Sequence, residues 1–159
     1  MEDQIVTSKN HTLSGLLALG IALSSTAMAA EPVTPKLTET LDLLLRQEMR
    51  SIQAAMGQIH SAIVMGQHDD VANQAQQVHD SFILKQSLTQ KDREDLRAAV
   101  PDGFLQMDQE FHELAAALAK AGRNKDTGNE YRIFNQMTRN CVECHNTYVS
   151  DRFPDLGAL

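Results

Sequence analysis

The feature that most constrains the fold of this chain is a stripe of apolar residues repeating every three or four positions within residues 35–65. The stripe consists of Leu41, Leu45, Met49, Ile52, Met56, Ile59 and Ile63. Side chains with this spacing share one face of an α-helix. We therefore expect one long helix here, and its apolar face must be buried against other helices.

Three further segments, residues 70–86, 102–121 and 126–150, have the same helical periodicity. Their expected inward-facing residues are Val71, Ala75, Val78, Phe82, Phe104, Met107, Phe111, Leu114, Leu118, Phe134, Met137, Cys141, Cys144 and Tyr148. A short helical piece over residues 92–99 is expected before Pro101. No period-two alternation lasts long enough to predict a strand. The pattern predicts an all-α fold, an antiparallel four-helix bundle.

The first 29 residues are predicted to be a signal peptide. Residues 13–29 form an apolar run that ends in small residues, and the sequence AMA at residues 27–29 matches a cleavage site. The run is short for a membrane span, although an uncleaved anchor is the alternative. Two acidic residues precede the lone Lys9, so either the true start lies downstream or export tolerates them. We expect a periplasmic domain over residues 30–159 that is not inserted in the membrane after cleavage.

The charge of the chain bears on its partners. The full sequence has a net charge of −7, and removing the expected signal peptide with its two acids and one lysine leaves −6. Nucleic-acid binding relies on lysine and arginine against phosphate, so we expect no nucleic-acid partner. Lysine and arginine are not clustered, which also disfavours binding to an anionic membrane surface. A mildly acidic domain is suited to transient docking on a partner with a basic surface.

The sequence CVECH carries the clearest chemical signal. It contains the only two cysteines, Cys141 and Cys144, and His145 follows them directly. A thioredoxin-like redox pair lies at a helix start among strands, whereas this pair lies late in an expected helix. A structural zinc site needs four ligands, but the other histidines are scattered singly. Both readings are therefore less favoured.

C-x-x-C-H in an exported chain is the signature of covalent haem attachment. Residues three apart lie on the same face of a helix, so both thiols can reach the two vinyl groups at one porphyrin edge. The neighbouring imidazole of His145 is then placed to bind the iron as the proximal axial ligand. The sequence predicts one haem c, attached through thioethers at Cys141 and Cys144.

The position of this motif, fifteen residues from the end of the chain, resembles the cytochrome c′ family and its methionine-ligated low-spin relatives. Matching features are LRQEM at residues 45–49, a proline in the connection between the second and third helices, and CVECHNTY with Tyr148. The family usually has a basic residue directly after that aromatic, where this chain has Val149; Arg152 follows three residues later. The resemblance implies a four-helix bundle with haem on its last helix, and it admits a homodimer.

The resemblance also suggests where the sixth iron ligand lies. In the family the distal residue follows the Arg-Gln element of the first helix; it is methionine in low-spin members and a non-ligating apolar residue in five-coordinate ones. Met49 follows that element and lies on the apolar stripe, so it is our candidate distal ligand. Counting back from Gly66 would instead select Arg50, which is not a normal iron ligand. Met56 is the second candidate.

Several other residues are candidates for the haem pocket. Arg46 could pair with a haem propionate through its planar guanidinium, or it could be a surface arginine. Met56, Phe82 and Tyr148 would pack in the pocket, with ordinary core packing as the simpler alternative for each. Two histidines at the edges of their stripes are less favoured sixth ligands: His79 and His112.

The sequence therefore predicts a periplasmic monohaem cytochrome c that carries single electrons between redox partner proteins and is not an enzyme. His145 would be its proximal ligand and Met49 its distal one. A thioether ligand raises the reduction potential. The alternatives are a five-coordinate, cytochrome c′-like protein that binds nitric oxide or carbon monoxide, and a haem-free helical interaction module.

Overall fold

The computed structural model describes residues 31–81 and 84–157, and every regular element within them is helical. The elements are the 3-10 helix η1 (Thr34–Lys36) and the α-helices α1 (Glu39–Met65), α2 (His68–Asp80), α3 (Leu84–Ser87), α4 (Gln90–Ala99), α5 (Asp102–Arg123) and α6 (Thr127–Tyr148). This confirms the expected all-α fold class. The expected signal peptide, residues 1–29, lies outside the described residues.

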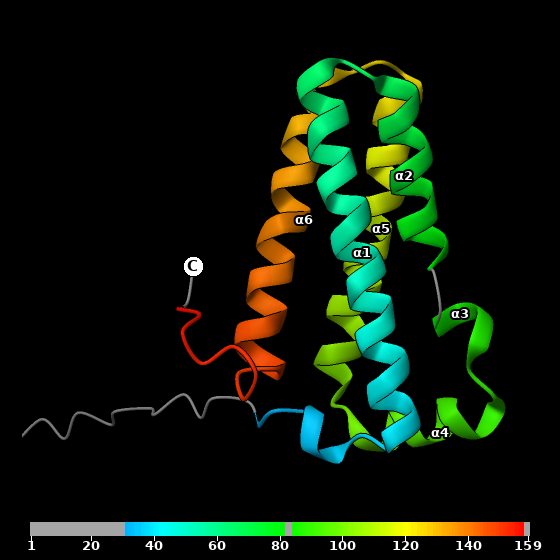
Figure 1. The fold of residues 1–159 in the computed structure, drawn as a ribbon, viewed down its shortest axis with the longest axis vertical. Helices are drawn as coiled ribbons and strands as arrows, with labels where there is room; N and C mark the ends of the chain where they lie inside the picture. Colours follow the sequence, from blue (N-terminus) through cyan, green and yellow to red (C-terminus); the bar gives the residue numbers. More distant parts are fainter. Residues whose placement is uncertain (1–30, 82–83, 158–159) are drawn as a thin grey trace, which may run out of the picture.

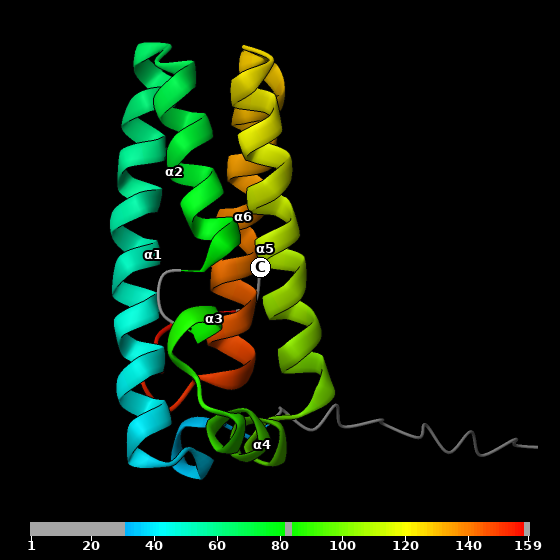
Figure 2. The ribbon, with the colours of Figure 1, turned by 90° about the vertical axis from the view of Figure 1, so that its right-hand side faces the viewer.

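The long helices α1, α2, α5 and α6 lie lengthwise beside one another (Figures 1 and 2). Helix α2 packs along α5, α5 along α6, and α1 along α2. The short helices α3 and α4 connect α2 to α5 near the end where α1 and α5 begin. This arrangement is compatible with a helical bundle. Across residues 31–81 and 84–157, no helix combines the length and apolar character that a membrane span requires.

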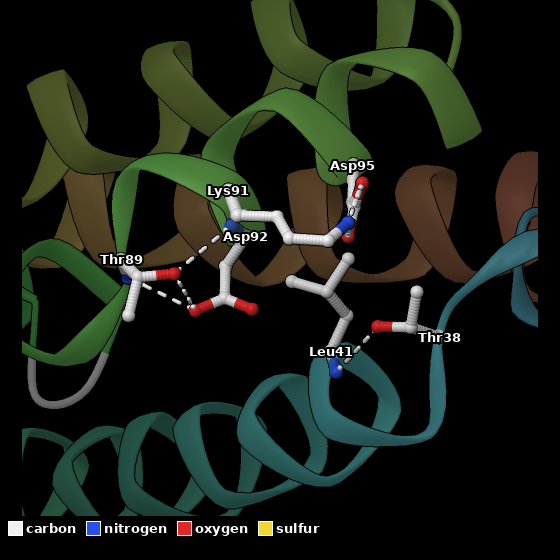
Figure 3. A network of polar contacts seen from close by, with 6 residues as sticks. All are labelled: Thr38, Leu41, Thr89, Lys91, Asp92 and Asp95. Carbon is white, nitrogen blue, oxygen red and sulfur yellow. Dashed lines mark hydrogen bonds and ion pairs between the residues drawn. The ribbon is translucent and has the colours of Figure 1, made fainter.

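The helix ends are set by local sequence signals. The Thr38 hydroxyl oxygen accepts a hydrogen bond from the backbone N–H of Leu41 and caps the start of α1 (Figure 3). Thr89 and Asp92 form a reciprocal capping box at the start of α4, with bonds of 2.9 and 3.1 Å (Figure 3). Gly66 ends α1 in the left-handed conformation, at φ 67°.

The buried face of α1 coincides only in part with the expected stripe. It is formed by Leu41, Glu48, Ile52, Ala55, Ile59 and Ala62. The other residues of the expected stripe are half-buried and pack against the apolar core: Leu45, Met49, Met56 and Ile63. The expected and observed faces differ because the expected stripe did not count alanine and glutamate as core residues.

The prediction of a single helix over residues 70–86 is wrong. Helix α2 ends at Asp80, because Ser81 has φ 62° and ψ 139°, a conformation that no helix contains. The buried Ser81 hydroxyl donates a 2.7 Å hydrogen bond to Oε1 of the buried Glu48, which joins the end of α2 to α1. Phe82, an expected inward-facing residue, lies outside the described residues.

A partly buried polar pair connects the α1–α2 turn to the start of α6 at the opposite end. The Nδ1 atom of His68, at the start of α2, lies 2.8 Å from Oε1 of Glu130, in α6. Glu130 is completely buried, and within the described part of the chain its Oε2 has no hydrogen-bond partner. The pair holds the α1–α2 turn against the first turns of α6.

The apolar core divides into two clusters. We call the larger one the main cluster; helices α1, α2, α5 and α6 contribute Ile52, Ala55, Ile59, Ala62, Val71, Ala75, Val78, Phe111, Ala115, Leu118, Ala119, Ala121, Ile133 and Met137. The second, here called the end cluster, lies where α5 begins and α6 ends and consists of Val33, Val100, Phe104 and Tyr148. A 2.8 Å hydrogen bond from the Val33 N–H to the Tyr148 carbonyl holds the lead-in segment against α6.

Helices α2 and α5 approach so closely at Gly122 that a larger residue would collide with backbone. A Cβ atom there would lie 2.8 Å from the Ala72 nitrogen and 2.8 Å from the His68 carbonyl oxygen. We expect Gly122→Ala to lower the free energy of unfolding by about 1–3 kcal/mol, the usual cost of overpacking. Urea unfolding followed by circular dichroism measures it.

Gly57 provides the matched control, because a Cβ atom there meets nothing within 4 Å. Gly57 lies inside α1, so Gly57→Ala should raise the free energy of unfolding by about 0.5–1 kcal/mol. If Gly122→Ala is as well tolerated as Gly57→Ala, α2 and α5 do not touch backbone to backbone.

Candidate haem site

Cys141, Cys144 and His145 lie in the last two turns of α6. Asp126 caps the start of the helix, and its side chain accepts a 3.1 Å hydrogen bond from the N–H of Asn129. Both cysteines are half-buried free thiols. Because the motif lies inside a regular helix, its spacing of three places both sulfurs on one face, as predicted.

The two cysteines lie at the boundary between the apolar clusters. Cys141 packs against the main cluster, and Cys144 packs against the end cluster. The same division occurs on α1, where Leu45 packs against the end cluster and Met49 against the main cluster. The motif and residues 45–49 are far apart in the sequence, but each segment has one residue packed against the main cluster and one packed against the end cluster.

Burial changes the chemistry of both thiols. Desolvation raises the pKa of Cys141 above its ordinary value and that of Cys144 to about 12, with Asp108 and Cys141 as further causes for Cys144. Thiols with raised pKa values stay protonated near neutral pH and are poor nucleophiles. A redox-active pair needs the opposite shift, so this environment argues against the thioredoxin-like reading.

The imidazole of His145 is suited to bind a metal. Desolvation lowers its pKa, which favours the neutral form that metals require. The ring stacks on Phe153, with 4.6 Å between centroids and 14° between planes. Within the described residues no hydrogen bond is made to either ring nitrogen. A stacked neighbour covers a face of the ring, whereas the nitrogen lone pair lies in the ring plane.

Zinc and haem place different demands on the three residues of the motif. Among residues 31–81 and 84–157, no three histidine, cysteine, aspartate or glutamate side chains converge as a metal site. A zinc ion would need Cys141, Cys144 and His145 to meet at one point. Covalent haem does not, because the sulfurs bond to porphyrin carbons and the imidazole alone bonds to the iron. The donor set therefore fits a covalently attached haem.

The candidate distal ligands lie on α1 as expected. Met49 and Met56 are half-buried, and both pack against the main cluster, as does Cys141. Met49 lies one turn of α1 after Leu45, which packs against the end cluster. Arg50 is exposed.

The described partner of Arg46 is a carboxylate on its own helix. Its Nε donates a 2.9 Å hydrogen bond to Asp42, and Arg152 donates another of 2.9 Å to the same carboxylate. The bond from Arg46 is the main cause that lowers the pKa of Asp42. Arg152, the basic residue that follows Val149 three positions later, is therefore also paired with Asp42.

Of the two aromatic pocket candidates, the structure describes Tyr148 but not Phe82. Tyr148 is buried in the end cluster, and its ring lies edge-on to Phe104 with 5.6 Å between centroids. Cys144 packs against the same cluster, so the structure brings these two candidates together. Phe82 lies outside the described residues.

The histidines considered as sixth ligands join α2 to α5. Nδ1 of His112 lies 2.7 Å from the carbonyl oxygen of Val78, and Nδ1 of His79 lies 3.0 Å from the carbonyl oxygen of His112. A carbonyl only accepts, so both Nδ1 atoms carry a proton and donate. His112 is buried and its Nε2 lies 3.8 Å from Asp108. These contacts give both rings a role in helix packing.

Sequence reasoning missed two residues near the site. Glu48 is only 1% exposed and lies on α1 between Leu45, which packs against the end cluster, and Met49, which packs against the main cluster. Its spacing, three after Leu45 and four before Ile52, is the available signal. Phe153 lies beyond α6, where helical periodicity carries no information, so the sequence held no comparable signal for its stack on His145.

Two surface hollows lie away from the motif. One of about 330 Å³ lies between α1 and α2, and one of about 480 Å³ lies beside η1 and the end of α4. None of their lining residues belongs to the motif.

Comparison with family models, curated proteins and solved structures gave no significant match to this chain. The site is therefore assigned from its residues and their arrangement.

The raised thiol pKa values predict slow alkylation in chain produced without haem attachment. At pH 8 we expect iodoacetamide to modify both cysteines at least about tenfold more slowly in the folded chain than in guanidinium, because one pKa unit changes the thiolate fraction tenfold. Mass spectrometry measures the rates. Cys144 should be the slower of the two.

The same shift has a consequence for stability. The unfolded chain loses the Cys144 proton near pH 9 and the folded chain only near pH 12, so the folded state should lose stability between these values.

For the alkylation experiment, equal rates in the folded and the unfolded chain would show that the thiols are not buried.

Proposed function

We propose that this protein is an exported monohaem cytochrome c, an antiparallel four-helix bundle that carries single electrons between redox partner proteins. The observation that carries the proposal is the CVECH motif in a regular helix, with both thiols free and half-buried at the boundary of two apolar clusters. The alternating chain direction of α1, α2, α5 and α6 supports the antiparallel bundle (Figures 1 and 2).

Each residue of the motif has a defined part in this proposal. Cys141 and Cys144 would hold the haem through thioethers, and His145 would bind the iron from the proximal side. When bound, the haem supplies a one-electron ferric–ferrous couple. The apolar clusters on both sides of the motif lower the polarity around it, which disfavours the extra positive charge of the ferric state. Ligand identity and burial thus set the potential, and the chain needs no catalytic group.

Export and partner choice follow from the sequence. The proposed signal peptide delivers the chain to the periplasm, where c-type haem is attached. After its removal the chain carries a net charge of −6, since two acids and one lysine leave with it. This charge favours transient docking on a redox partner with a basic surface.

A second candidate function is supported by the displaced face of α1. Glu48 is buried in the stripe, whereas Met49 is only half-buried at its edge. A distal side without a methionine ligand would give a five-coordinate protein that binds nitric oxide or carbon monoxide. The cytochrome c′ resemblance accommodates both functions.

The first test is covalent haem itself. The full chain, expressed in a host that matures c-type cytochromes in its periplasm, should keep a haem stain on a denaturing gel and gain the mass of one haem. Cys141→Ala/Cys144→Ala should lose the stain, because no other cysteine exists. His79→Gln is the control and should keep it. An exported chain without haem would instead support a haem-free helical interaction module.

The second test identifies the distal ligand. In the absorption spectrum of the oxidised holoprotein we expect a low-spin form, and Met49→Ala should convert it to high spin by removing the thioether. Met56→Ala, on the same helix and cluster, is the control and should stay low-spin. A high-spin spectrum in the unmodified protein would establish the five-coordinate alternative, and loss of low spin only in Met56→Ala would move the ligand to Met56.

A further inference from the structure

We propose that Phe153 is the positioning residue for His145: the segment after α6 folds back, lays the phenyl ring on the imidazole and fixes the plane in which this ligand binds iron. The inference rests on the proposed haem function. It concerns a residue outside the CVECH motif and outside the helix that carries it.

The stack is close and nearly parallel. The two ring centroids are 4.6 Å apart and the planes differ by 14°. Phe153 is still 42% exposed, so burial in a core does not explain its position. Its ring contact among the described residues is with the imidazole. Phe153 covers a face of the imidazole, whereas the nitrogens lie in the ring plane, so the stack itself does not block a bond to a metal.

The segment that carries Phe153 is tied to two other parts of the chain. Arg152 donates a 2.9 Å hydrogen bond to Asp42 of α1, and the Thr34 hydroxyl donates one of 3.1 Å to Asp151. The N–H groups of Arg152 and Phe153 both donate to the carbonyl of Val149 in a tight turn after α6. These bonds limit how far the phenyl ring can move from the imidazole.

His145 needs an external group to set its ring orientation. A metal-binding histidine usually donates its other ring N–H to a carbonyl or carboxylate, and this bond fixes the ring. The described residues supply no such partner to His145. Rotation about the bond to the imidazole is otherwise broad, so a flat ring against one face is the feature that restricts it here.

The test uses the holoprotein and three variants. Phe153→Leu keeps apolar bulk but removes the flat ring, whereas Phe153→Tyr keeps the ring. Tyr131→Leu is the matched control, because Tyr131 is another exposed aromatic near the start of α6, far from the motif. Electron paramagnetic resonance of the ferric protein and its midpoint potential are measured, since both respond to the axial imidazole.

We expect Phe153→Leu to shift the g values or split them into more than one set, and to shift the midpoint potential. Phe153→Tyr and Tyr131→Leu should match the unmodified protein. Arg152→Gln removes the bond to Asp42 without changing the phenyl ring, and it should shift the g values and the midpoint potential in the same direction. If Phe153→Leu does not fold, Arg152→Gln provides the test of the proposal.

The possible failures can be told apart. Unmodified protein without covalent haem would overturn both this inference and the proposed function. Haem-loaded Phe153→Leu with unchanged g values and potential would overturn this inference alone. A shift in Phe153→Tyr as large as that in Phe153→Leu would also overturn it, because the ring would then not be the cause.

Discussion

The regular hydrogen-bonded course of α6 through its last two turns is the constraint on which the candidate site depends. Because the helix continues without a break to Tyr148, Cys141 and Cys144 lie about one helical turn apart, and both sulfurs share a face of the helix. The same turn spans the boundary between the two apolar clusters, so Cys141 and Cys144 each contact a different one. A kink at this point would separate the two sulfurs and expose the histidine.

The parts of the fold that the sequence predicted are those governed by local signals. The long helices over residues 39–65, 102–123 and 127–148 combine helical periodicity with caps or breakers at their ends, and their bounds were predicted to within a few residues. The break at Ser81 was not predictable, because the conformation of this residue is accompanied by a long-range bond to Glu48. A pattern search that counts only apolar residues does not place a glutamate in the core.

The candidate site divides in the same way. The placement of the cysteines and His145 on one helix followed from the motif. Arg46 was a candidate for pairing with a haem propionate or for a surface arginine, and its described partner is Asp42 four residues earlier, an ion pair that helical spacing alone could have indicated. The stack of Phe153 on His145 depends on how an irregular segment folds back, which periodicity does not describe.

The backbone contact at Gly122 also sets the axial register of two helices. With no side chain between them, α2 cannot slide along α5 without bringing a bulkier residue to the crossing point. The position of every α2 residue along the helix axis is thereby fixed. Ser81, at the other end of α2, therefore lies beside Glu48. The absence of a side chain at Gly122 thus fixes where, along the bundle, Ser81 meets Glu48.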